Sequence, residues 1–391
     1  MIEVERAQAL CLELVAPLAR HETVPLAQAA GRRLAVTARA WRAQPPFASA
    51  AMDGYAVQSA DLVPGAVLQV VGESAAGHGW SGAVAPGQAL RIFTGAPVPE
   101  GADHVVIQED VTRDGSQITV LPTLGQGSNI RPLGADFAAD FALAAPRTLS
   151  AWDLSLLAAM NVAEVTVLAR PRVALLATGD ELVMPGQDPG PDQIIASNVF
   201  ALKAMIDAAG GEGVILPIAP DREDALAEAM AAMQFADIAV TIGGASVGDH
   251  DLVGKVGAAM GLQRAFYKIA MRPGKPLIAG LLSGRPYLGL PGNPVSAIVC
   301  GHLFLVPMVR RALGLTEVLP RTQTARLACD VAANGPRTHY MRARVEDGIV
   351  TPFAQQDSSL LTVMAEANAL LIRPLGEGAQ GVGAMVNILP L

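Results

Sequence analysis

Four glycine- and proline-rich turns carry most of the side chains in this sequence that could bind an anionic ligand. They are TGDEL at residues 178–182, GGASVGDHD at 243–251, RPGKP at 272–276 and GLPGNP at 289–294. Each turn follows an apolar run that is typical of a buried parallel strand. Because ligands of an open α/β sheet bind at the carboxyl ends of its strands, we expect the four turns to converge on one pocket. Backbone N–H groups, lysines, an arginine and several carboxylates would suit that pocket to an anionic substrate.

The GGASVGDHD turn has the spacing of a phosphate-binding loop but lacks its lysine. Gly243 and Gly248 match the first half of the motif G-x-x-x-x-G-K-[ST]. Asp249 and His250 occupy the next two positions, which disfavours a Walker-type NTPase. The backbone N–H groups of such a turn can surround a phosphate, and Asp249 and Asp251 could hold a divalent cation. The alternative is a tight strand-to-helix turn with an acidic helix start.

The TGDEL and RPGKP turns supply charges of both signs. Asp180 and Glu181 follow a strand and suit Mg²⁺ or a ribose hydroxyl, although a helix-capping aspartate with a first-turn glutamate gives the same pattern. Lys268, Arg272 and Lys275 fall close together, and the arginine can bind an oxyanion through two parallel hydrogen bonds. A solvated basic edge is the alternative, but the two prolines of RPGKP favour a rigid, built site.

Composition limits the possible partners and the compartment. The chain has 391 residues, of which 51% are hydrophobic, so we expect two to four domains with sizeable cores. With 28 basic and 36 acidic residues the net charge is −8, which argues against bulk binding to nucleic acid or to an acidic membrane. Three scattered cysteines indicate neither disulfides nor zinc and fit a reducing compartment. No signal peptide is evident, so we expect a soluble, cytoplasmic protein.

The N-terminal half predicts a helical domain with a β-rich insertion. Apolar residues at helical spacing predict an amphipathic helix near the start of the chain and a second helical segment over 26–34. Residues 45–140 alternate short apolar pieces with Gly and Pro, which is typical of a small β-rich domain. The simplest arrangement inserts this domain into a discontinuous helical domain made of residues 1–44 and 141–170.

The C-terminal half predicts two further domains. Residues 171–316 alternate strands and helices, which indicates a doubly wound parallel sheet. Within them, the longest apolar stretch is too short to span a membrane and is interpreted as a buried helix, with Asn293 as its N-cap and Pro294 at its first position. Residues 317–391 return to short strands and predict a small β-barrel or sandwich.

Three earlier turns carry Asp53 in SAAMDGYAV, Thr94 in FTGAPVP and Asp136 in NIRPLGADF, and turn chemistry alone explains each of them singly. As an ordered series, however, the motifs closely resemble those of the molybdopterin molybdenumtransferases, the molybdenum insertases of molybdenum-cofactor synthesis (the MoeA and gephyrin E-domain family). The matching segments, in order, are PPFASAAMDGYAV, FTGAPVPEGADHVV, RPLGADF, LLATGDEL, SNVFAL, GGASVGDHD, AMRPGKP and GLPGNPVSA.

The resemblance implies an α/β multidomain fold and a reaction. The fold would combine a doubly wound, molybdopterin-binding α/β domain, an elongated helical dimerisation domain, an inserted β-rich domain and a C-terminal β-barrel. The implied protein is a homodimer whose site lies between the sheet domain of one subunit and the second domain of its partner. The implied reaction inserts molybdate into adenylylated molybdopterin (molybdopterin-AMP) and releases AMP, with Mg²⁺ as cofactor. A molybdopterin adenylyltransferase and apo-molybdoenzymes are the implied protein partners.

The resemblance also carries over site residues. The implied catalytic residues are Asp53, Thr94, Glu181, Asp221 and Asp251. The implied substrate-binding residues are Asp136, Gly243, Gly244, Ser246, Gly248, Lys268, Arg272, Lys275, Pro291 and Pro294, and the implied metal ligands are Glu181, Asp249 and Asp251. Two positions depart from the family pattern. Arg272 replaces a lysine found in many members, and QDSSLLTV lacks the glycine usual between its serines, which puts a role for Ser358 or Ser359 in doubt.

Three alternative functions stay open at this point. A molybdopterin adenylyltransferase would consume ATP and release pyrophosphate, but in that relative the glycine turn typically reads GGTG rather than the GGAS found here. A gephyrin-like, non-catalytic scaffold would need partner-binding grooves. An insertase specialised for tungstate would carry the same motifs.

Overall fold

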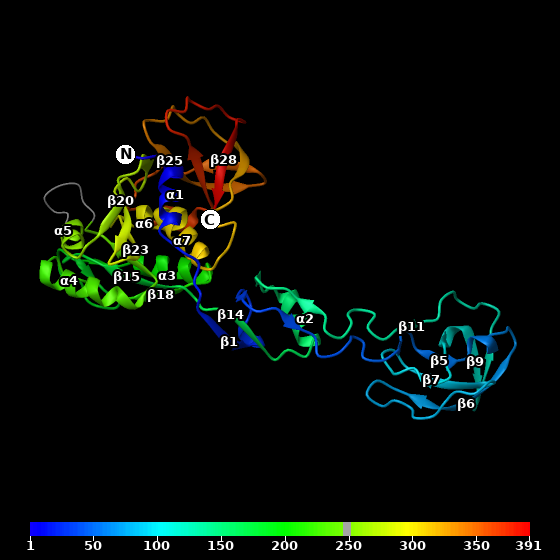
Figure 1. The fold of residues 1–391 in the computed structure, drawn as a ribbon. Helices are drawn as coiled ribbons and strands as arrows, with labels where there is room; N and C mark the ends of the chain where they lie inside the picture. The colour runs from blue at the N-terminus through cyan, green and yellow to red at the C-terminus, as the bar shows by residue number, and fades with distance from the viewer. Residues whose placement is uncertain (245–251) are drawn as a thin grey trace. The chain divides into compact units, whose positions relative to one another are not determined.

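The chain folds into two compact units. A computed structural model describes residues 1–244 and 252–391 (Figure 1). Unit 1 consists of Met1–Arg20 and Leu168–Leu391, and unit 2 of His21–Val167. Both units contain their own buried apolar clusters.

A six-stranded sheet forms the centre of unit 1. Its strands, in spatial order, are β18 (Glu212–Ile215), β15 (Arg172–Ala177), β19 (Ile238–Ile242), β23 (Arg285–Leu290), β22 (Ile278–Leu282) and β20 (Gln263–Tyr267). The first four run parallel, as expected of a doubly wound fold, and the last two form an antiparallel edge that the sequence did not predict. All five residues of β19 are buried, because helices cover both faces of the sheet.

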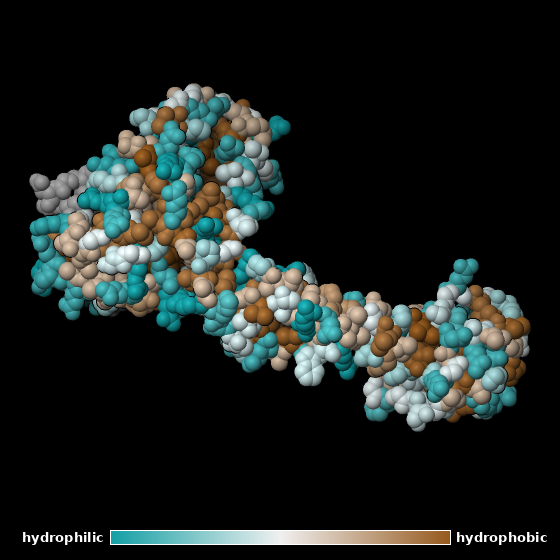
Figure 2. All heavy atoms as spheres, viewed as in Figure 1, coloured by the Kyte–Doolittle hydropathy of each residue, from teal (hydrophilic) through white to brown (hydrophobic). Residues whose placement is uncertain are grey.

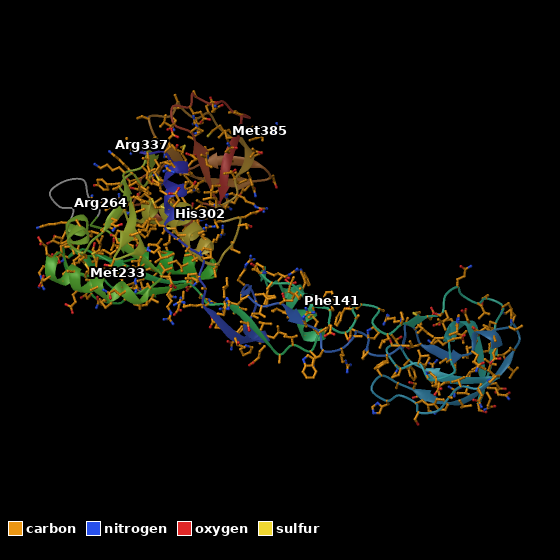
Figure 3. All side chains as sticks on the ribbon, viewed as in Figure 1. Phe141, Met233, Arg264, His302, Arg337 and Met385 are labelled. Atoms are coloured by element: carbon orange, nitrogen blue, oxygen red, sulfur yellow. The ribbon has the colours of Figure 1, made fainter. Side chains whose placement is uncertain are left out.

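The helices divide between the two faces (Figure 1). One apolar core joins the sheet to α1 (Val4–Glu13), α3 (Asn198–Ala208), α6 (Pro294–Cys300) and α7 (Val306–Ala312). A second core joins it to α4 (Glu223–Ala232) and α5 (Leu252–Ala259). Figure 3 labels Met233, which belongs to the second core, and His302, which lies in the helical segment of the first.

The long apolar segment is a core helix. A π-helical turn at Gly301–Leu305 joins α6 to α7, so that one helical run extends over Pro294–Ala312. Among the described residues this is the one helix long and apolar enough to cross a bilayer, yet 78% of its apolar window is buried inside the protein. The buried helix predicted from the sequence is therefore confirmed, and its N-cap is Asn293 with Pro294 at the first position.

A closed five-stranded barrel follows the α/β domain in unit 1. Its strands, in spatial order, are β25 (Thr338–Glu346), β26 (Ile349–Pro352), β24 (Gln323–Leu327), β28 (Met385–Pro390) and β27 (Ala369–Arg373), and β27 pairs with β25 to close the ring. Figure 3 labels Met385 on the last of these strands in the chain. Helix α8 (Leu361–Glu366) lies between β26 and β27 in the chain, and β21 (Met271–Arg272) pairs with β25 from the α/β domain. Of the two architectures that the sequence allowed, the structure has the barrel.

Unit 2 contains the predicted β-rich insertion. Its six-stranded sheet has the order β8 (His104–Ile107), β5 (Gly54–Val57), β7 (Gln88–Ile92), β6 (Val67–Ser74), β10 (Gln117–Val120) and β9 (Val111–Asp114). Two apolar clusters contain the inward-facing residues of this sheet. Two pairs of short antiparallel strands flank this sheet in the sequence. β4 (Ser49–Ala50) pairs with β11 (Ile130–Arg131), and β3 (Ala38–Arg39) pairs with β12 (Ala142–Leu143).

The rest of unit 2 is a small sheet with one α-helix among its described elements. The sheet order is β1 (His21–Pro25), β14 (Glu164–Leu168), β2 (Arg33–Leu34) and β13 (Arg147–Thr148), and the helix is α2 (Ala151–Ala159). A capping box starts α2, because Ser150 and Asp153 each accept a hydrogen bond from the other's backbone N–H.

Two expectations about the N-terminal region differ from the structure. The helical segment over 26–34 is wrong: a 3₁₀ turn covers Leu26–Gln28 and ends there, Gly31 then has a left-handed φ of +71°, and β2 follows. The helix α1 forms as expected, but its apolar face packs into the core of unit 1 rather than with residues 21–44. Its burial against α7 and β22 explains this placement. The further division into four domains stays a prediction.

Candidate functional site

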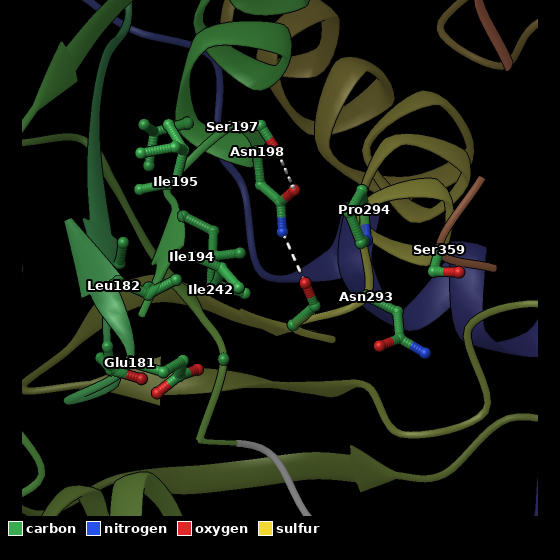
Figure 4. Close-up of a pocket in the computed structure, with 16 residues that line it drawn as sticks. Glu181, Leu182, Ile194, Ile195, Ser197, Asn198, Ile242, Asn293, Pro294 and Ser359 are labelled. Carbon is green, nitrogen blue, oxygen red and sulfur yellow. Dashed lines mark hydrogen bonds between the residues drawn. The ribbon is translucent and has the colours of Figure 1, made fainter. Parts of the chain in front are cut away.

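A pocket lies at the point where the strand order of the α/β sheet reverses. β15 and β19 are neighbours there, and ligands of doubly wound sheets bind in the crevice beyond such strands. The pocket has a volume of about 400 Å³ (Figure 4). Its polar lining residues are Thr178, Glu181, Ser197, Asn198, Asn293 and Ser359, together with the backbone of Gly243 and Gly292. Three of the four glycine- and proline-rich turns therefore meet here, and RPGKP does not line this pocket.

Glycine is required at the turn after β19. Gly243 and Gly244 have φ values of +97° and +63°, which side-chain-bearing residues rarely adopt. A Cβ at Gly243 would also lie 2.7 Å from the carbonyl oxygen of Thr178. The backbone can thus pass close to the end of β15 and face the pocket. Ser246, Gly248, Asp249 and Asp251 lie outside the described residues, so the rest of the predicted phosphate turn stays a prediction.

Thr178 is a pocket residue whose role sequence reasoning missed, although it begins the TGDEL motif. Its side chain is 2% exposed, and its Oγ1 makes no hydrogen bond to any described residue. Its backbone N–H donates to the carbonyl of Ile242, which fixes the residue between β15 and β19. A buried hydroxyl without a partner costs about 1–3 kcal/mol, so an acceptor or donor on a bound ligand would relieve it.

The predicted acidic residues occupy different positions around the pocket. Glu181 lies at one end of it, and Asn293 and Ser359 lie at the other (Figure 4). Asp180 accepts a hydrogen bond of 3.0 Å from the backbone N–H of Asp221, and neither residue lines the pocket. Among the described residues no three Asp, Glu, His or Cys side chains form a metal-binding group. The predicted metal ligands other than Glu181 fall outside the described residues.

The α6 start connects the pocket to the C-terminal segment. Asn293 does not cap α6 with its side chain; its Nδ2 donates instead to Ser358 Oγ at 2.8 Å. The N–H of Val295 donates to the carbonyl oxygen of Ser358. Ser359 lines the pocket, and its backbone N–H and hydroxyl lower the pKa of Asp357 below its ordinary value. These serines therefore contact the site despite the missing glycine. Pro294 also lines the pocket, whereas the buried Pro291 does not.

The RPGKP turn and the preceding Lys268 present three cations. Lys268, Arg272 and Lys275 form no side-chain hydrogen bond or ion pair with any residue that the structure describes. Lys268 has a left-handed φ of 74°, and its Nζ lies 4.8 Å from the centre of the Tyr267 ring. Three cations without carboxylate partners among the described residues make a local positive site in a chain of net charge −8.

The barrel adds two basic residues that sequence reasoning did not single out. Arg342 is fully buried; its Nη2 donates to the carbonyl oxygens of Gln355 and Asp357, while its Nε and Nη1 have no partner among the described residues. Burial and the nearby Arg272 lower its pKa, and Asp357 opposes this. His339 is the cross-strand partner of Arg272. Burial, then Arg272, lower its pKa to about 4. The alternation of HYMRARV gives only a weak signal for these positions.

Unit 2 brings Asp53 and Thr94 together. Asp53 Oδ1 accepts hydrogen bonds from the N–H and the hydroxyl of Thr94, at 2.7 and 2.8 Å, and these bonds lower the pKa of Asp53. Arg91 stacks over the Tyr55 ring at 5.1 Å and further lowers that pKa. Asp136 lines a separate cavity of about 550 Å³ in the same unit, which also contacts Gly95, the residue after Thr94.

Family models cover most of the chain. Residues 2–161 match the MoeA N-terminal region (domain I and II), residues 174–311 a probable molybdopterin binding domain, and residues 324–391 the MoeA C-terminal region (domain IV).

Individual relatives agree with these matches. A molybdopterin molybdenumtransferase from Nostoc sp. is 36% identical over 95% of this chain and 88% of its own length. One from Haemophilus influenzae is 37% identical over 80% of this chain and 78% of its own length. Two solved structures of a molybdopterin biosynthesis MoeA protein from Pyrococcus horikoshii cover all of this chain and 99–100% of their own, with TM-scores of 0.85 and 0.83 at 29% and 26% identity. The chain therefore belongs to the molybdopterin molybdenumtransferase (MoeA) family.

Proposed function

We propose that this chain is a transferase of molybdenum-cofactor biosynthesis that inserts molybdenum from molybdate into adenylylated molybdopterin and releases AMP. The names of its relatives support the reaction class. The observation that carries the proposal is the pairing of a switch-point pocket with cations that have no carboxylate partner among the described residues. An anionic, phosphate-bearing substrate fits both the pocket and these cations.

The pocket would hold the adenylate half of the substrate. The left-handed backbone at Gly243 and Gly244 leaves room for a phosphate. The Thr178 hydroxyl, which has no partner among the described residues, would donate to one of its oxygens. The apolar side chains of Leu182, Ile194 and other lining residues would exclude water from the rest of the nucleotide. This arrangement would bind and orient the phosphoanhydride that is cleaved when AMP leaves.

The cations would hold molybdate and the molybdopterin phosphate. Arg272 can bind an oxyanion through two hydrogen bonds, and Lys268 and Lys275 act as point charges. The Nε and Nη1 atoms of Arg342 have no partner among the described residues, and this side chain lies close enough to Arg272 for the Arg272 charge to lower the pKa of Arg342. The helix α6 connects the two halves, because Pro294 lines the pocket and Cys300, about 9 Å along the helix, contacts the RPGKP turn.

Mg²⁺ is part of the proposal. Glu181 is an exposed carboxylate on the pocket and fits a hard cation, and Asp249 or Asp251 would complete the ligand set. A bound Mg²⁺ would polarise the phosphoanhydride. The role of the chain itself would be to place that bond between Thr178, the glycine turn and the cations.

A cytoplasmic homodimer is also part of the proposal. Trp41 and Trp152 in unit 2 are 81% and 84% exposed, and Figure 2 shows apolar residues at the visible surface of this unit. Burial of such side chains would stabilise a dimer. In that dimer Asp53 and Thr94 of one subunit would complete the site of the other. The free cysteines Cys11, Cys300 and Cys329 support a reducing compartment.

The test is AMP release from adenylylated molybdopterin with Mg²⁺, with and without molybdate, in the absence of ATP. We expect AMP release that depends on molybdate, together with transfer of activity to an apo-molybdoenzyme. Pyrophosphate formed from ATP and free molybdopterin would instead identify an adenylyltransferase, and no turnover in either assay would support a scaffold. Replacing molybdate by tungstate in the same assay measures the preference between the two oxyanions.

A further inference from the structure

We propose that Cys300 and Gly274 are positioning residues that hold the cation turn, residues 268–276, in the conformation that binds the anionic substrate. The inference rests on the proposed function of that turn. It assigns a role to a buried thiol at the end of α6, about 9 Å along the helix from Pro294 in the pocket.

The tip of the cation turn lies directly on the Cys300 thiol. Gly274 has a left-handed φ of +103°, and its carbonyl oxygen lies 3.9 Å from Cys300 Sγ, as acceptor of a weak S–H hydrogen bond. A Cβ at Gly274 would lie 2.4 Å from Cys300 Sγ and 3.2 Å from Met271 Cε. The turn can therefore approach α6 this closely only because residue 274 has no side chain.

The remainder of the cation turn is fixed by its backbone. The N–H of Lys268 donates to Leu277 and the N–H of Ile269 to Lys275, which closes the base of the turn. Ile2 forms two backbone hydrogen bonds with this segment, accepting from Ala270 and donating to Lys268. Because backbone hydrogen bonds fix the base of the turn, the contact with Cys300 determines the position of Gly274 at its tip.

Both cations of the tip depend on that contact. Arg272, held in β21 against β25, precedes Gly274 by two residues and Lys275 follows it directly, so a shift of Gly274 moves Lys275 relative to Arg272. Burial raises the pKa of the Cys300 thiol well above its ordinary value, so the thiol stays protonated and remains a donor. Bidentate binding of an oxyanion is sensitive to displacements of this kind, because two hydrogen bonds must align at once.

Cys11 provides a matched control. It is also a buried cysteine, 1% exposed, in the same apolar core as Cys300, and burial likewise raises the pKa of its thiol, to about 12. The three atoms nearest to a Cβ built at Gly274 do not include any atom of Cys11. Cys11→Ala and Cys300→Ala thus remove the same group from one core, and only the second removes it from beneath the turn.

The experiment is calorimetric titration of the full chain with molybdate, combined with the KM and kcat of molybdate-dependent AMP release. We expect Cys300→Ala to raise the molybdate Kd and KM by about five- to tenfold with a smaller change in kcat, and Cys300→Ser, which keeps a donor, to stay within about twofold of the parent. Cys11→Ala should also stay within about twofold, although both alanine variants lower the Tm. Gly274→Ala should weaken binding more than Cys300→Ala does.

Arg272→Ala separates this inference from the function on which it rests. If Arg272→Ala weakens binding and Cys300→Ala changes the Kd no more than Cys11→Ala does, the positioning role is wrong and the proposed function stands. If Arg272→Ala leaves the Kd and KM unchanged, the cation turn does not bind the anion and both proposals fall. Should Gly274→Ala fail to fold, the comparison of the three cysteine variants decides the matter.

Discussion

Replacing Thr178 by valine should stabilise the protein and weaken its substrate binding. Valine has nearly the same shape as threonine but no hydroxyl, and Thr178 Oγ1 is buried without a hydrogen-bond partner among the described residues. Removing an unpaired buried hydroxyl recovers about 1–3 kcal/mol of unfolding free energy. Most core substitutions destabilise, so a gain here would point specifically to the unpaired hydroxyl.

The gain should appear in one unit only. All three tryptophans, Trp41, Trp80 and Trp152, lie in unit 2, so tryptophan fluorescence follows that unit, whereas calorimetry also detects the unfolding of unit 1. For a unit of roughly 250 residues, 1 kcal/mol shifts the Tm by about 2–4 °C. We expect Thr178→Val to raise the Tm of unit 1 by a few degrees and to leave the fluorescence transition unchanged.

The neighbouring strand offers the control. Thr241 on β19 is also fully buried, but its Oγ1 lies 2.6 Å from the hydroxyl of Tyr287. Thr241→Val should therefore lower the Tm of unit 1, because it removes a hydrogen bond that is made. If Thr178→Val lowered the Tm as well, its hydroxyl would be paired in the free protein and the reasoning would be refuted. Substrate binding by Thr178→Val should weaken although its Tm rises. Loss of a hydrogen bond to a charged phosphate predicts about a ten- to hundredfold higher KM for this variant.

Four other outcomes follow from the site. Glu181→Ala and Asp53→Ala should fold with a near-normal Tm but lose at least about 100-fold in molybdate-dependent AMP release, and turnover like that of the parent would contradict the site assignment. Arg272→Ala should raise the substrate KM more than it lowers kcat, which steady-state kinetics would measure. Because the pKa of His339 is lowered from 6.5 to about 4, its contribution to the stability of unit 1 should be fully present above pH 6.5 and be lost as the pH falls towards 4. His339→Gln should flatten this dependence in calorimetric scans, and an unchanged slope would exclude His339 as its source. For the proposed homodimer, Trp152→Glu on α2 should shift sedimentation from dimer to monomer, and an unchanged dimer would exclude Trp152 from the interface.

The sequence predicted best those elements that local pattern determines. The continuous apolar runs became β15 and β19, and the Asn-Pro pair starts α6 because proline fits the first helical position. The glycines at 243 and 274 mark tight turns, as their left-handed φ values require. Three of the four predicted turns meet at one pocket because the parallel strands end at the same edge of the sheet.

Long-range contacts account for what the sequence did not reveal. Residues 26–34 have helical spacing, but Arg33 and Leu34 pair with strands more than 100 residues later in the chain, and that pairing overrides local propensity. The apolar face of α1 gave no indication that it would pack in unit 1 rather than beside residues 21–44. No local pattern distinguishes the buried hydroxyl of Thr178 or the buried guanidinium of Arg342 from their exposed counterparts.

In this acidic chain several carboxylates pair with cations that lie outside the cation turn. Arg20 contacts Asp237 at 2.7 Å and Arg147 contacts Asp153 at 2.8 Å, whereas Arg272 and Lys275 have no carboxylate partner among the described residues. Arg342 goes further, because two nitrogens of its buried guanidinium, Nε and Nη1, have no partner among the described residues, and such burial is unfavourable. The Thr178 hydroxyl in the pocket likewise has no partner among the described residues. No described residue relieves either deficit, so an acceptor on a bound oxyanion that paired with these groups would strengthen its binding. On this argument Thr178 and Arg342, which lack partners for these atoms among the described residues, are two groups of unit 1 that the proposed substrate would contact.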